Sequence, residues 1–249
     1  MIDRSDLIVP DWPAPANVRA FFTTRRGGAS QGEFASLNLG LHVGDELRHV
    51  QENRARLQAM LPSAPGWLNQ VHGTNVYEFL RVDSADVAPQ ADAAMTCEAS
   101  KVCAVLVADC LPVLFCNDDG SCVAAAHAGW RGLAAGVLER TVASMKTPPA
   151  GTMAWLGPAI GSSAFEVGQD VVDAFVSQSI HARSWFTAID NKPGKYLADI
   201  FQLARQRLNA VGVERIFGGE FCTVSDPSRF FSYRRDGRTG RMAGVIWRD

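Results

Sequence analysis

The sequence predicts an α+β protein with mixed β-sheets. Strand-like and helix-like segments follow one another without a regular strand–helix–strand rhythm, and apolar runs short enough for buried strands crowd the middle of the chain. The 249 residues contain no internal repeat, no low-complexity tract and no linker rich in proline or glycine. We therefore expect residues 1–249 to form one domain.

The first half of the chain is predicted to hold one surface helix among several strands. Val18–Thr24 is rich in β-branched and aromatic residues, which favours a strand. Glu46–Leu61 spaces its apolar residues as on one face of a helix, and Pro62 ends it. The other predicted strands are Trp67–Val71, Asn75–Leu80, Val102–Ala108, Pro112–Phe115 and Cys122–Ala126.

The second half is predicted to alternate between helices and short strands. Trp130–Met145 carries an apolar stripe at helical spacing, so it is expected to be one helix. The remaining predicted helices are Val167–Ser177 and Leu197–Val211, and the remaining predicted strands are Met153–Leu156, Arg215–Phe217, Phe230–Tyr233 and Arg241–Trp247.

Charge and hydropathy exclude several classes of partner. The net charge is −2, so no overall field favours nucleic acid or an anionic membrane. No apolar run reaches the roughly 20 residues that a membrane helix needs. The N-terminal segment does not have the pattern of a signal peptide, so we expect a cytoplasmic protein, monomeric by default, that acts on a small molecule. The six cysteines are then expected to be thiols.

Three short phrases carry the side chains that are best suited to bind a metal or act as a nucleophile: QVHG, ADCLP and HAGWRG. They place His72, Cys110 and His127 where an apolar strand meets a turn, and such positions present side chains to a cleft. Two histidines and one cysteine are a typical zinc set that leaves a fourth position open. Their spacing does not by itself bring them together, so two backbone-bonded histidines and a core thiol remain the alternative.

Neighbouring residues offer further candidates. His127 lies just before the predicted helix at Trp130, and a helix N-terminus would favour a thiolate at Cys110. Asp109 is either a proton shuttle or the cap of a turn. Guanidinium groups bind phosphate in a bidentate manner. The candidate phosphate ligands, each of which has a surface role as the alternative, are Arg25, Arg131, Arg235 and Arg241.

Seven phrases in this order resemble those of the YfiH-like family, also called the laccase-domain or polyphenol-oxidase family. The resemblance runs from about Phe21 to Trp247, and the combination of QVHG, ADC-x-P and HAGWRG is specific. The phrases are FTTRRGGAS, SLNLGLHVGD, NQVHGTNV, ADCLPVLF, AAHAGWRG, GPAIGSSAFEVG and FFSYRRDGRTGRMAGVIW.

The resemblance implies a layered α/β/β/α fold and a zinc site at His72, Cys110 and His127. It also implies purine nucleoside phosphorolysis, in which adenosine or inosine and phosphate give ribose 1-phosphate and the free base. Adenosine deamination and methylthioadenosine phosphorolysis belong to the same repertoire. A bacterial branch of the family is linked to the editing of peptidoglycan precursors.

Three other functions compete with this one. A multicopper polyphenol oxidase is disfavoured because the chain has five histidines and no His-x-His pair, although copper is an alternative metal at the same site. In a thiol hydrolase acting on peptidoglycan peptides, Cys110 would be the nucleophile and His127 its base. A structural zinc protein would need a fourth ligand, such as His42 or Cys222.

Overall fold

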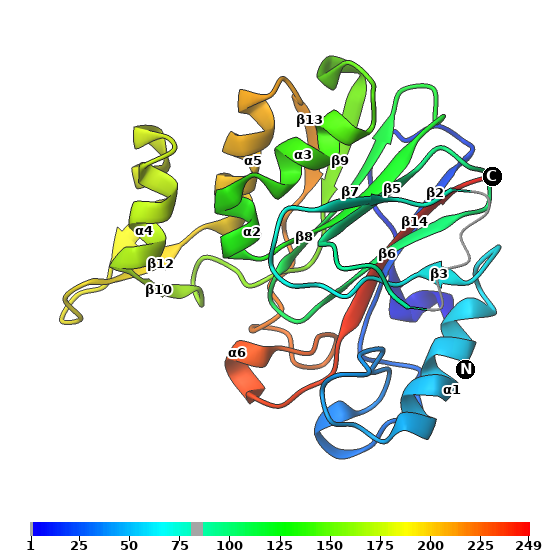
Figure 1. The fold of residues 1–249 in the computed structure, drawn as a ribbon. Coiled ribbons are helices and arrows are strands. Elements are labelled where there is room, and N and C mark those ends of the chain that lie inside the picture. Colours follow the sequence, from blue (N-terminus) through cyan, green and yellow to red (C-terminus); the bar gives the residue numbers. More distant parts are fainter. Residues whose placement is uncertain (1, 81–86) are drawn as a thin grey trace.

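The protein consists of two stacked β-sheets with helices on their outer faces (Figure 1). The structure is a computed structural model that describes residues 2–80 and 87–249. The predicted α+β class with mixed sheets and the implied α/β/β/α layers are both confirmed. The assignment of residues 1–249 to one catalytic domain stays a prediction, and residues 1 and 81–86 lie outside the described part.

The six-stranded sheet has the strand order β13-β9-β7-β8-β5-β4. Its central strands pair antiparallel, whereas β13 with β9 and β4 with β5 pair parallel. Helices cover one face and the second sheet covers the other, so the central strands read as continuous apolar runs. The strands are β4 (Val76–Glu78), β5 (Ala93–Thr96), β7 (Leu111–Asn117), β8 (Val123–Ala128), β9 (Thr152–Leu156) and β13 (Arg215–Gly218).

The five-stranded sheet has the order β1-β2-β14-β6-β3 and packs against the first through Phe22, Val105 and Ile246. Its strand β14 reaches the sheet from the far end of the chain and lies between β2 and β6. Both ends of the chain therefore contribute strands to this sheet. The strands are β1 (Leu7–Ile8), β2 (Val18–Thr23), β3 (Pro65–Gly66), β6 (Val102–Val107) and β14 (Met242–Arg248).

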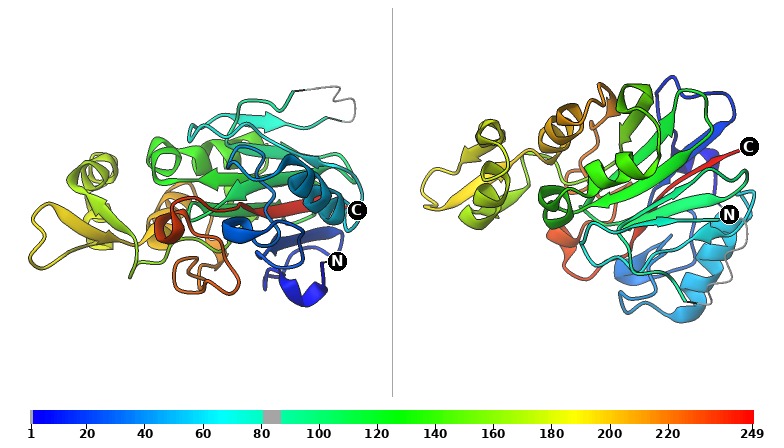
Figure 2. Two further views of the ribbon diagram at one scale, coloured as in Figure 1. Left: turned by 90° about the horizontal axis from the view of Figure 1, so that it is seen from below. Right: turned by 45° about the horizontal axis from the view of Figure 1, so that its top comes forward.

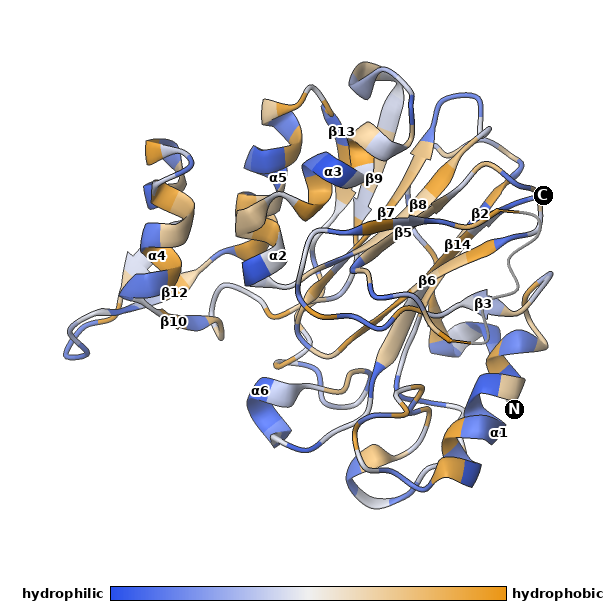
Figure 3. Cartoon of the chain, in the orientation of Figure 1, coloured by the Kyte–Doolittle hydropathy of each residue, from blue (hydrophilic) through white to orange (hydrophobic). Residues whose placement is uncertain are grey.

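Helices close the two outer layers. Leu57 of α1 packs on the five-stranded sheet, and α2, α3 and α5 cover the six-stranded sheet. Figure 3 shows the apolar residues gathered in the sheets and on the inward helix faces, which is the amphipathic pattern that directs this packing. The helices are α1 (Leu47–Gln58), α2 (Trp130–Ala135), α3 (Val137–Ser144), α5 (Ile200–Ala210) and α6 (Tyr233–Asp236).

A small unit projects from the helical side of the molecule (Figures 1 and 2). It contains a three-stranded sheet and one helix, and the apolar face of that helix joins the core beneath α5 through Val172 and Phe175. Its elements are β10 (Glu166–Gly168), α4 (Gln169–Val176), β11 (Phe186–Ala188) and β12 (Lys195–Ala198). Short 3-10 turns lie at Arg4–Asp6, Gly32–Phe34, Pro149–Gly151 and Ile180–Trp185.

Several predicted elements were wrong in extent or type. The predicted strand Trp67–Val71 is a loop in which Asn69 forms one isolated bridge with Gln90. The predicted strand Phe230–Tyr233 is instead an irregular, buried segment over residues 230–232, after which Tyr233 begins α6. The predicted helix Trp130–Met145 breaks into α2 and α3 at Gly136, whose φ of 97° is outside the helical region.

Two predicted helices begin later than expected. The first turn of the predicted helix Val167–Ser177 belongs instead to β10, and α4 starts at Gln169. The predicted helix Leu197–Val211 starts within β12, and α5 begins only after Asp199, whose carboxylate caps it by accepting from Gln202 N. In both cases a short strand runs almost directly into the helix, with Gly168 as the N-cap of α4 and Asp199 as the N-cap of α5.

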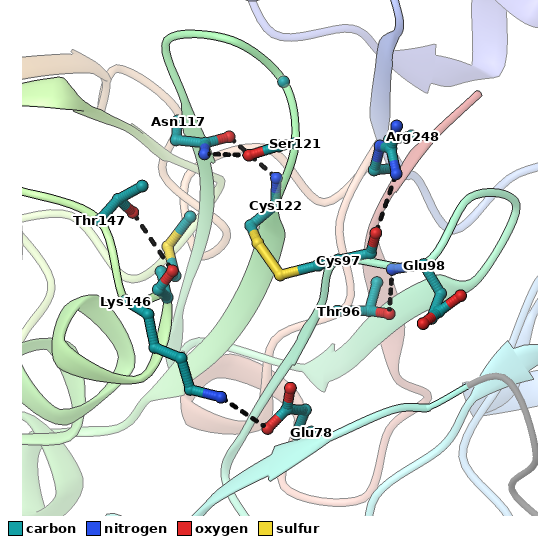
Figure 4. The surroundings of a disulfide bond; sticks show 12 residues. Glu78, Thr96, Cys97, Glu98, Asn117, Ser121, Cys122, Lys146, Thr147 and Arg248 are labelled. Atoms are coloured by element: carbon teal, nitrogen blue, oxygen red, sulfur yellow. Dashed lines mark hydrogen bonds and ion pairs between the residues drawn. A yellow bond between two sulfur atoms is a disulfide. The ribbon is translucent and has the colours of Figure 1, made fainter.

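The cysteines do not all carry free thiols. Cys97 and Cys122 form a disulfide that joins the end of β5 to the start of β8 (Figure 4). The free thiols are those of Cys103, Cys110, Cys116 and Cys222, so the expectation of six thiols was wrong for this pair. The cytoplasmic location from which that expectation came stays a prediction. None of the helices in the described ranges has the length and apolar character to cross a membrane.

Candidate metal centre

The three predicted metal ligands converge at one edge of the layer between the two sheets. His72 lies in the loop between β3 and β4, Cys110 in the turn from β6 to β7, and His127 near the end of β8. Their ligand atoms all lie within 4.8 Å of one another. Cys110 Sγ is 3.8 Å from His72 Nε2, and the two imidazole rings meet edge to face with centroids 4.8 Å apart.

This donor set fits a zinc ion. With Zn–N bonds of about 2.0–2.1 Å and a Zn–S bond of about 2.3 Å at tetrahedral angles, the ligand atoms lie roughly 3.3–3.6 Å apart. The Cys110 Sγ–His72 Nε2 separation of 3.8 Å is near this range, whereas the full set spans up to 4.8 Å, so binding of zinc would draw the three side chains closer together. In the described part of the chain, neither His42 nor Cys222 joins the group as a fourth protein ligand. The arrangement therefore keeps one coordination position open.

The backbone around the ligands adopts conformations that bring them close together. His72 has a φ of 60° and Asp109 a φ of 86°, both in the left-handed region that is unusual for residues with a side chain. Gly129 must lack a side chain, because a Cβ there would lie 2.8 Å from His72 Cδ2 and 3.0 Å from Cys110 Sγ. The glycine in the HAGWRG phrase thus makes room for the cluster.

A buried carboxylate lies behind the two histidines. Asp92 is fully buried, and its Oδ1 lies 2.8 Å from His127 Nδ1. The same carboxylate accepts hydrogen bonds from the backbone N–H groups of Val71, His72 and Gly73. Although burial alone would raise the pKa of Asp92, these hydrogen bonds and the charge of His127 lower it, so the group is a carboxylate.

The surroundings of Cys110 and His127 favour the charged form of each. Burial opposes ionisation of the thiol, but the charges and hydrogen bonds of His127 and His72 lower the pKa of Cys110. Burial likewise opposes protonation of His127, and the charge of Cys110 together with the hydrogen bond to Asp92 raises the pKa of His127. The thiolate that results is the form that binds a metal or attacks an electrophile.

The ligands open into a cavity of about 580 Å³. Besides the three ligands, its walls include His42, Gln70, Tyr233 and Arg241. A second cavity of about 320 Å³ shares His42, Tyr233 and Arg241 with it, so the space continues past these side chains. Tyr233 is 61% exposed, which leaves an aromatic face available at the opening. Cavities of this size hold small molecules.

Of the four arginines predicted to bind phosphate, Arg241 lies on the wall of this cavity. Its Nη1 donates to the carbonyl oxygens of Thr239 and Gly240, which fixes the guanidinium. Gly40 is packed against the side chain, and a Cβ there would lie 2.8 Å from Arg241 Cγ. Burial lowers the pKa of Arg241, while the charges of Cys110 and Asp109 act in the opposite direction.

The other three arginines have different surroundings. Arg25 donates to the carbonyl oxygens of Ala35 and Pro227, and Arg235 binds the carbonyl oxygens of Thr223, Val224 and Phe230. Exposed Arg131 stacks on the ring of Trp130. The described lining of the cavity includes none of the three. Their predicted role in substrate binding stays a prediction.

The carboxylate of Asp109, predicted as a proton shuttle or a turn cap, makes structural contacts. Its Oδ1 accepts a hydrogen bond of 2.6 Å from Thr223 Oγ1, and its Oδ2 accepts one of 2.6 Å from Arg234 N. These bonds tie the turn before Cys110 to the segment that leads to α6. The arrangement favours the capping alternative.

Sequence reasoning did not single out Asp92, Tyr233 or Gln70, and it gave His42 only a minor part. Gln70 exchanges two hydrogen bonds with the backbone of Leu106, of 2.8 and 2.7 Å, and so fixes the loop before His72 against β6. A signal for Asp92 was present, because a lone acid interrupts the small-residue run ADAAMT. A buried carboxylate needs hydrogen-bond partners, and metal-bound histidines commonly have such a carboxylate on their other ring nitrogen.

Comparison with known proteins gives a consistent result. Residues 19–249 match the sequence model of the family described as multi-copper polyphenol oxidoreductase laccase. The chain is 55% identical over 240 residues to the purine nucleoside phosphorylase PA4543 of Pseudomonas aeruginosa, covering 96% of this chain and 97% of the relative. It is also 55% identical over 245 residues to the purine nucleoside phosphorylase YfiH of Escherichia coli, covering 98% and 99%.

Solved structures show the same fold. The protein NMB0706 of Neisseria meningitidis superimposes with a TM-score of 0.93 at 52% identity, covering 98% of this chain and 99% of that one. YlmD of Geobacillus stearothermophilus superimposes with a TM-score of 0.88 at 33% identity, covering 100% and 98%. The match therefore extends over both sheets and the projecting unit.

Proposed function

The chain belongs to the YfiH-like, laccase-domain family, and from this membership we propose that it is a zinc-dependent purine nucleoside phosphorylase. Its substrates are adenosine or inosine and phosphate, and its products are ribose 1-phosphate and the free base. One observation of the site carries the proposal: His72, Cys110 and His127 meet at one end of a cavity whose wall also contains half-buried Arg241. The cavity thus combines a metal site with an anion site.

Arg241 is the proposed ligand of phosphate. Because its Nη1 is occupied by two backbone carbonyls, the remaining N–H groups point in a fixed direction and bind two phosphate oxygens. The exposed ring of Tyr233 offers a stacking face for the purine, and His42 offers a polar contact for the ribose. The two partners are then held side by side, which lowers the entropic cost of the reaction.

In the reaction, a phosphate oxygen bonds to C1′ of the ribose as the C1′–N9 bond breaks. The purine leaves with the bonding electron pair and takes up a proton from water. A bound zinc ion would supply Lewis acidity and an open coordination position beside the cavity. Arg241 holds the phosphate during this step.

Adenosine deamination and methylthioadenosine phosphorolysis are proposed as further activities of the same site. Deamination replaces the amino group at C6 by oxygen from water and releases ammonia, so it does not require phosphate. Methylthioadenosine differs from adenosine at the 5′ position, and the neighbouring cavity of about 320 Å³ gives room for such a substituent. A dependence on phosphate separates the two kinds of activity.

A thiol hydrolase acting on peptidoglycan peptides is the second candidate. The order Cys110, His127, Asp92 is that of a nucleophile, its base and the carboxylate that orients the base. The thiolate would bond to an amide carbonyl carbon, and the amine would leave with a proton from His127. Water would then hydrolyse the thioester. Metal content distinguishes this candidate, because a metal-bound thiolate is less free to attack carbon.

Copper is the alternative metal, since two histidines and a cysteine are also the ligands of blue-copper sites. Within the described ranges the structure gathers one such cluster, whereas a multicopper oxidase needs several copper ions. Metal analysis of the purified protein and its visible spectrum decide between the two. A strong copper–thiolate absorption together with phenol oxidation would contradict the zinc proposal.

The deciding experiment follows adenosine, with and without phosphate, by chromatography, using protein whose metal content is known. We expect adenine and ribose 1-phosphate in the presence of phosphate, and we expect loss of both zinc and product in His72→Ala, Cys110→Ala and His127→Ala. Cys222→Ala is the matched control, because this thiol is also half-buried but lies outside the cavity. A protein that holds one zinc and leaves nucleosides intact would contradict the proposal, and metal-free protein that cleaves peptides would favour the thiol hydrolase.

A further inference from the structure

Asp92 connects the two histidine ligands through one carboxylate group. Oδ1 lies 2.8 Å from His127 Nδ1 and accepts a bond of 2.8 Å from His72 N. Oδ2 accepts from Gly73 N at 2.6 Å and from Val71 N at 3.2 Å. The backbone oxygen of Asp92 also accepts from His127 N at 2.7 Å. One fully buried residue therefore contacts the segments that carry both histidines.

The contact with His127 fixes the tautomer and the direction of its ring. A carboxylate only accepts hydrogen bonds, so Nδ1 of His127 carries the proton. Nε2 then faces the centre of the cluster, where it would bind a metal through its lone pair once its proton is displaced. A metal-bound histidine usually has such a partner on its other nitrogen, which also makes the ring more basic.

The contact with the His72 segment has a different effect. His72 has a φ of 60°, an unfavourable backbone conformation for a residue with a side chain. Three successive N–H groups, those of residues 71–73, point to the carboxylate and hold the backbone in this conformation. Since His72 itself is exposed, burial does not hold this backbone in place.

We propose that Asp92 is a positioning residue that sets the geometry of both histidine ligands and thereby the metal affinity of the site. Asp92 is fully buried and is not part of the described cavity wall, so it acts through the histidines and does not touch the substrate. This inference rests on the metal site of the proposed function. It does not depend on which substrate is turned over.

The first test compares zinc affinities of the wild type, Asp92→Asn and the control Asp170→Asn by competition with a chelator. Asp170 is an exposed acid of the projecting unit, so the variant Asp170→Asn tests the loss of one negative charge alone. In Asp92→Asn an NH₂ group replaces one carboxylate oxygen. This group cannot accept the hydrogen bonds of the N–H groups that face it. We expect zinc affinity to fall about 10- to 100-fold, as for other partners of metal-bound histidines, and the cobalt–thiolate spectrum to change. Unchanged affinity in a folded Asp92→Asn protein would overturn the inference.

A second measurement needs no variant and covers the case in which Asp92→Asn does not fold. ¹⁵N-histidine NMR of the zinc-loaded wild type reports which nitrogen of His127 is protonated. We expect a protonated Nδ1 and a metal-bound Nε2. The opposite tautomer would overturn the inference. A wild type that binds zinc but leaves nucleosides intact contradicts the proposed function alone, because both measurements here read the metal site directly.

Discussion

The two halves of the predicted site behave differently in the structure. The three metal ligands, far apart in sequence, come together within 4.8 Å, whereas the four arginines disperse and Arg241 alone of them lies on the cavity wall. Cys110 and His127 lie at the ends of the paired strands β7 and β8, and hydrogen bonds to Asp92 hold the loop of His72 beside them. An arginine has five donors and a long side chain, and Arg25 and Arg235 use theirs to bind backbone carbonyls of loops. Residue type is thus a better guide to function where the backbone is fixed by paired strands or buried hydrogen bonds than for a long, many-donor side chain.

The largest effect is expected from the ligands. In Cys110→Ser we expect loss of zinc and a fall in phosphorolysis, because a metal ion contributes several kcal/mol, roughly a thousandfold in rate. Metal content and turnover are measured on the same preparation. If the variant kept zinc and full activity, the three side chains would not act as one site, and the contrast with the arginines would disappear.

The second effect concerns the thiol in metal-free protein. Burial opposes its ionisation, but His127 and His72 lower the pKa of Cys110 to about 6. Alkylation of Cys110 should therefore be constant above this pH and fall as the pH drops below it, whereas an ordinary thiol has its midpoint near pH 8.5. The rate is followed against pH with Cys110→Ala as the background, and zinc should suppress it. A midpoint above pH 8 would show that the histidines do not stabilise the thiolate.

A smaller effect is expected at Arg241. In Arg241→Lys the charge remains but the planar fork is lost, so KM for phosphate should rise about 10-fold or more, since hydrogen bonds of charged groups contribute about 1.5–3 kcal/mol. Zinc content should not change. The measurement is initial rate against phosphate concentration. An unaltered KM would remove Arg241 from the anion site and return the search to the other three arginines.

The smallest effect on activity is expected at Arg235. Its guanidinium binds three backbone carbonyls, so Arg235→Ala should lower the free energy of unfolding by about 1–3 kcal/mol, while KM for phosphate stays the same. Thermal unfolding and phosphate kinetics are compared on one preparation. A raised KM with unchanged stability would show that the loop arginines do take part in binding.

Much of the fold could be predicted because its strands are buried on both faces. β2, β6, β7, β8 and β9 coincide closely with apolar runs in the sequence. The strand β5 was missed since its four residues, Ala-Ala-Met-Thr, carry almost no β-branched signal. The break at Gly136 was missed because the apolar stripe continues across it in the sequence. In the structure, this glycine adopts a φ that a helix does not allow.

The site was predictable to the extent that its motifs were specific. QVHG, ADC and HAGWRG pointed to the three side chains that the structure brings together, but nothing local indicates that Asp92 lies behind two of them. That contact depends on the pairing of β5 with β8, which places Asp92 beside His127. Likewise, Tyr233 reaches the cavity through a turn that the sequence presented as a strand.

The disulfide in Figure 4 has a mechanical consequence for that pairing. Strands β5 and β8 carry Asp92 and His127 at one end, and Cys97 and Cys122 at the other. Side chains alternate between the two faces of a strand, so sliding one strand by a single residue would set Asp92 opposite an alanine directed to the helix side. The covalent bond between Cys97 and Cys122 prevents this slide. It thereby keeps Asp92 beside His127 at the opposite end of the two strands.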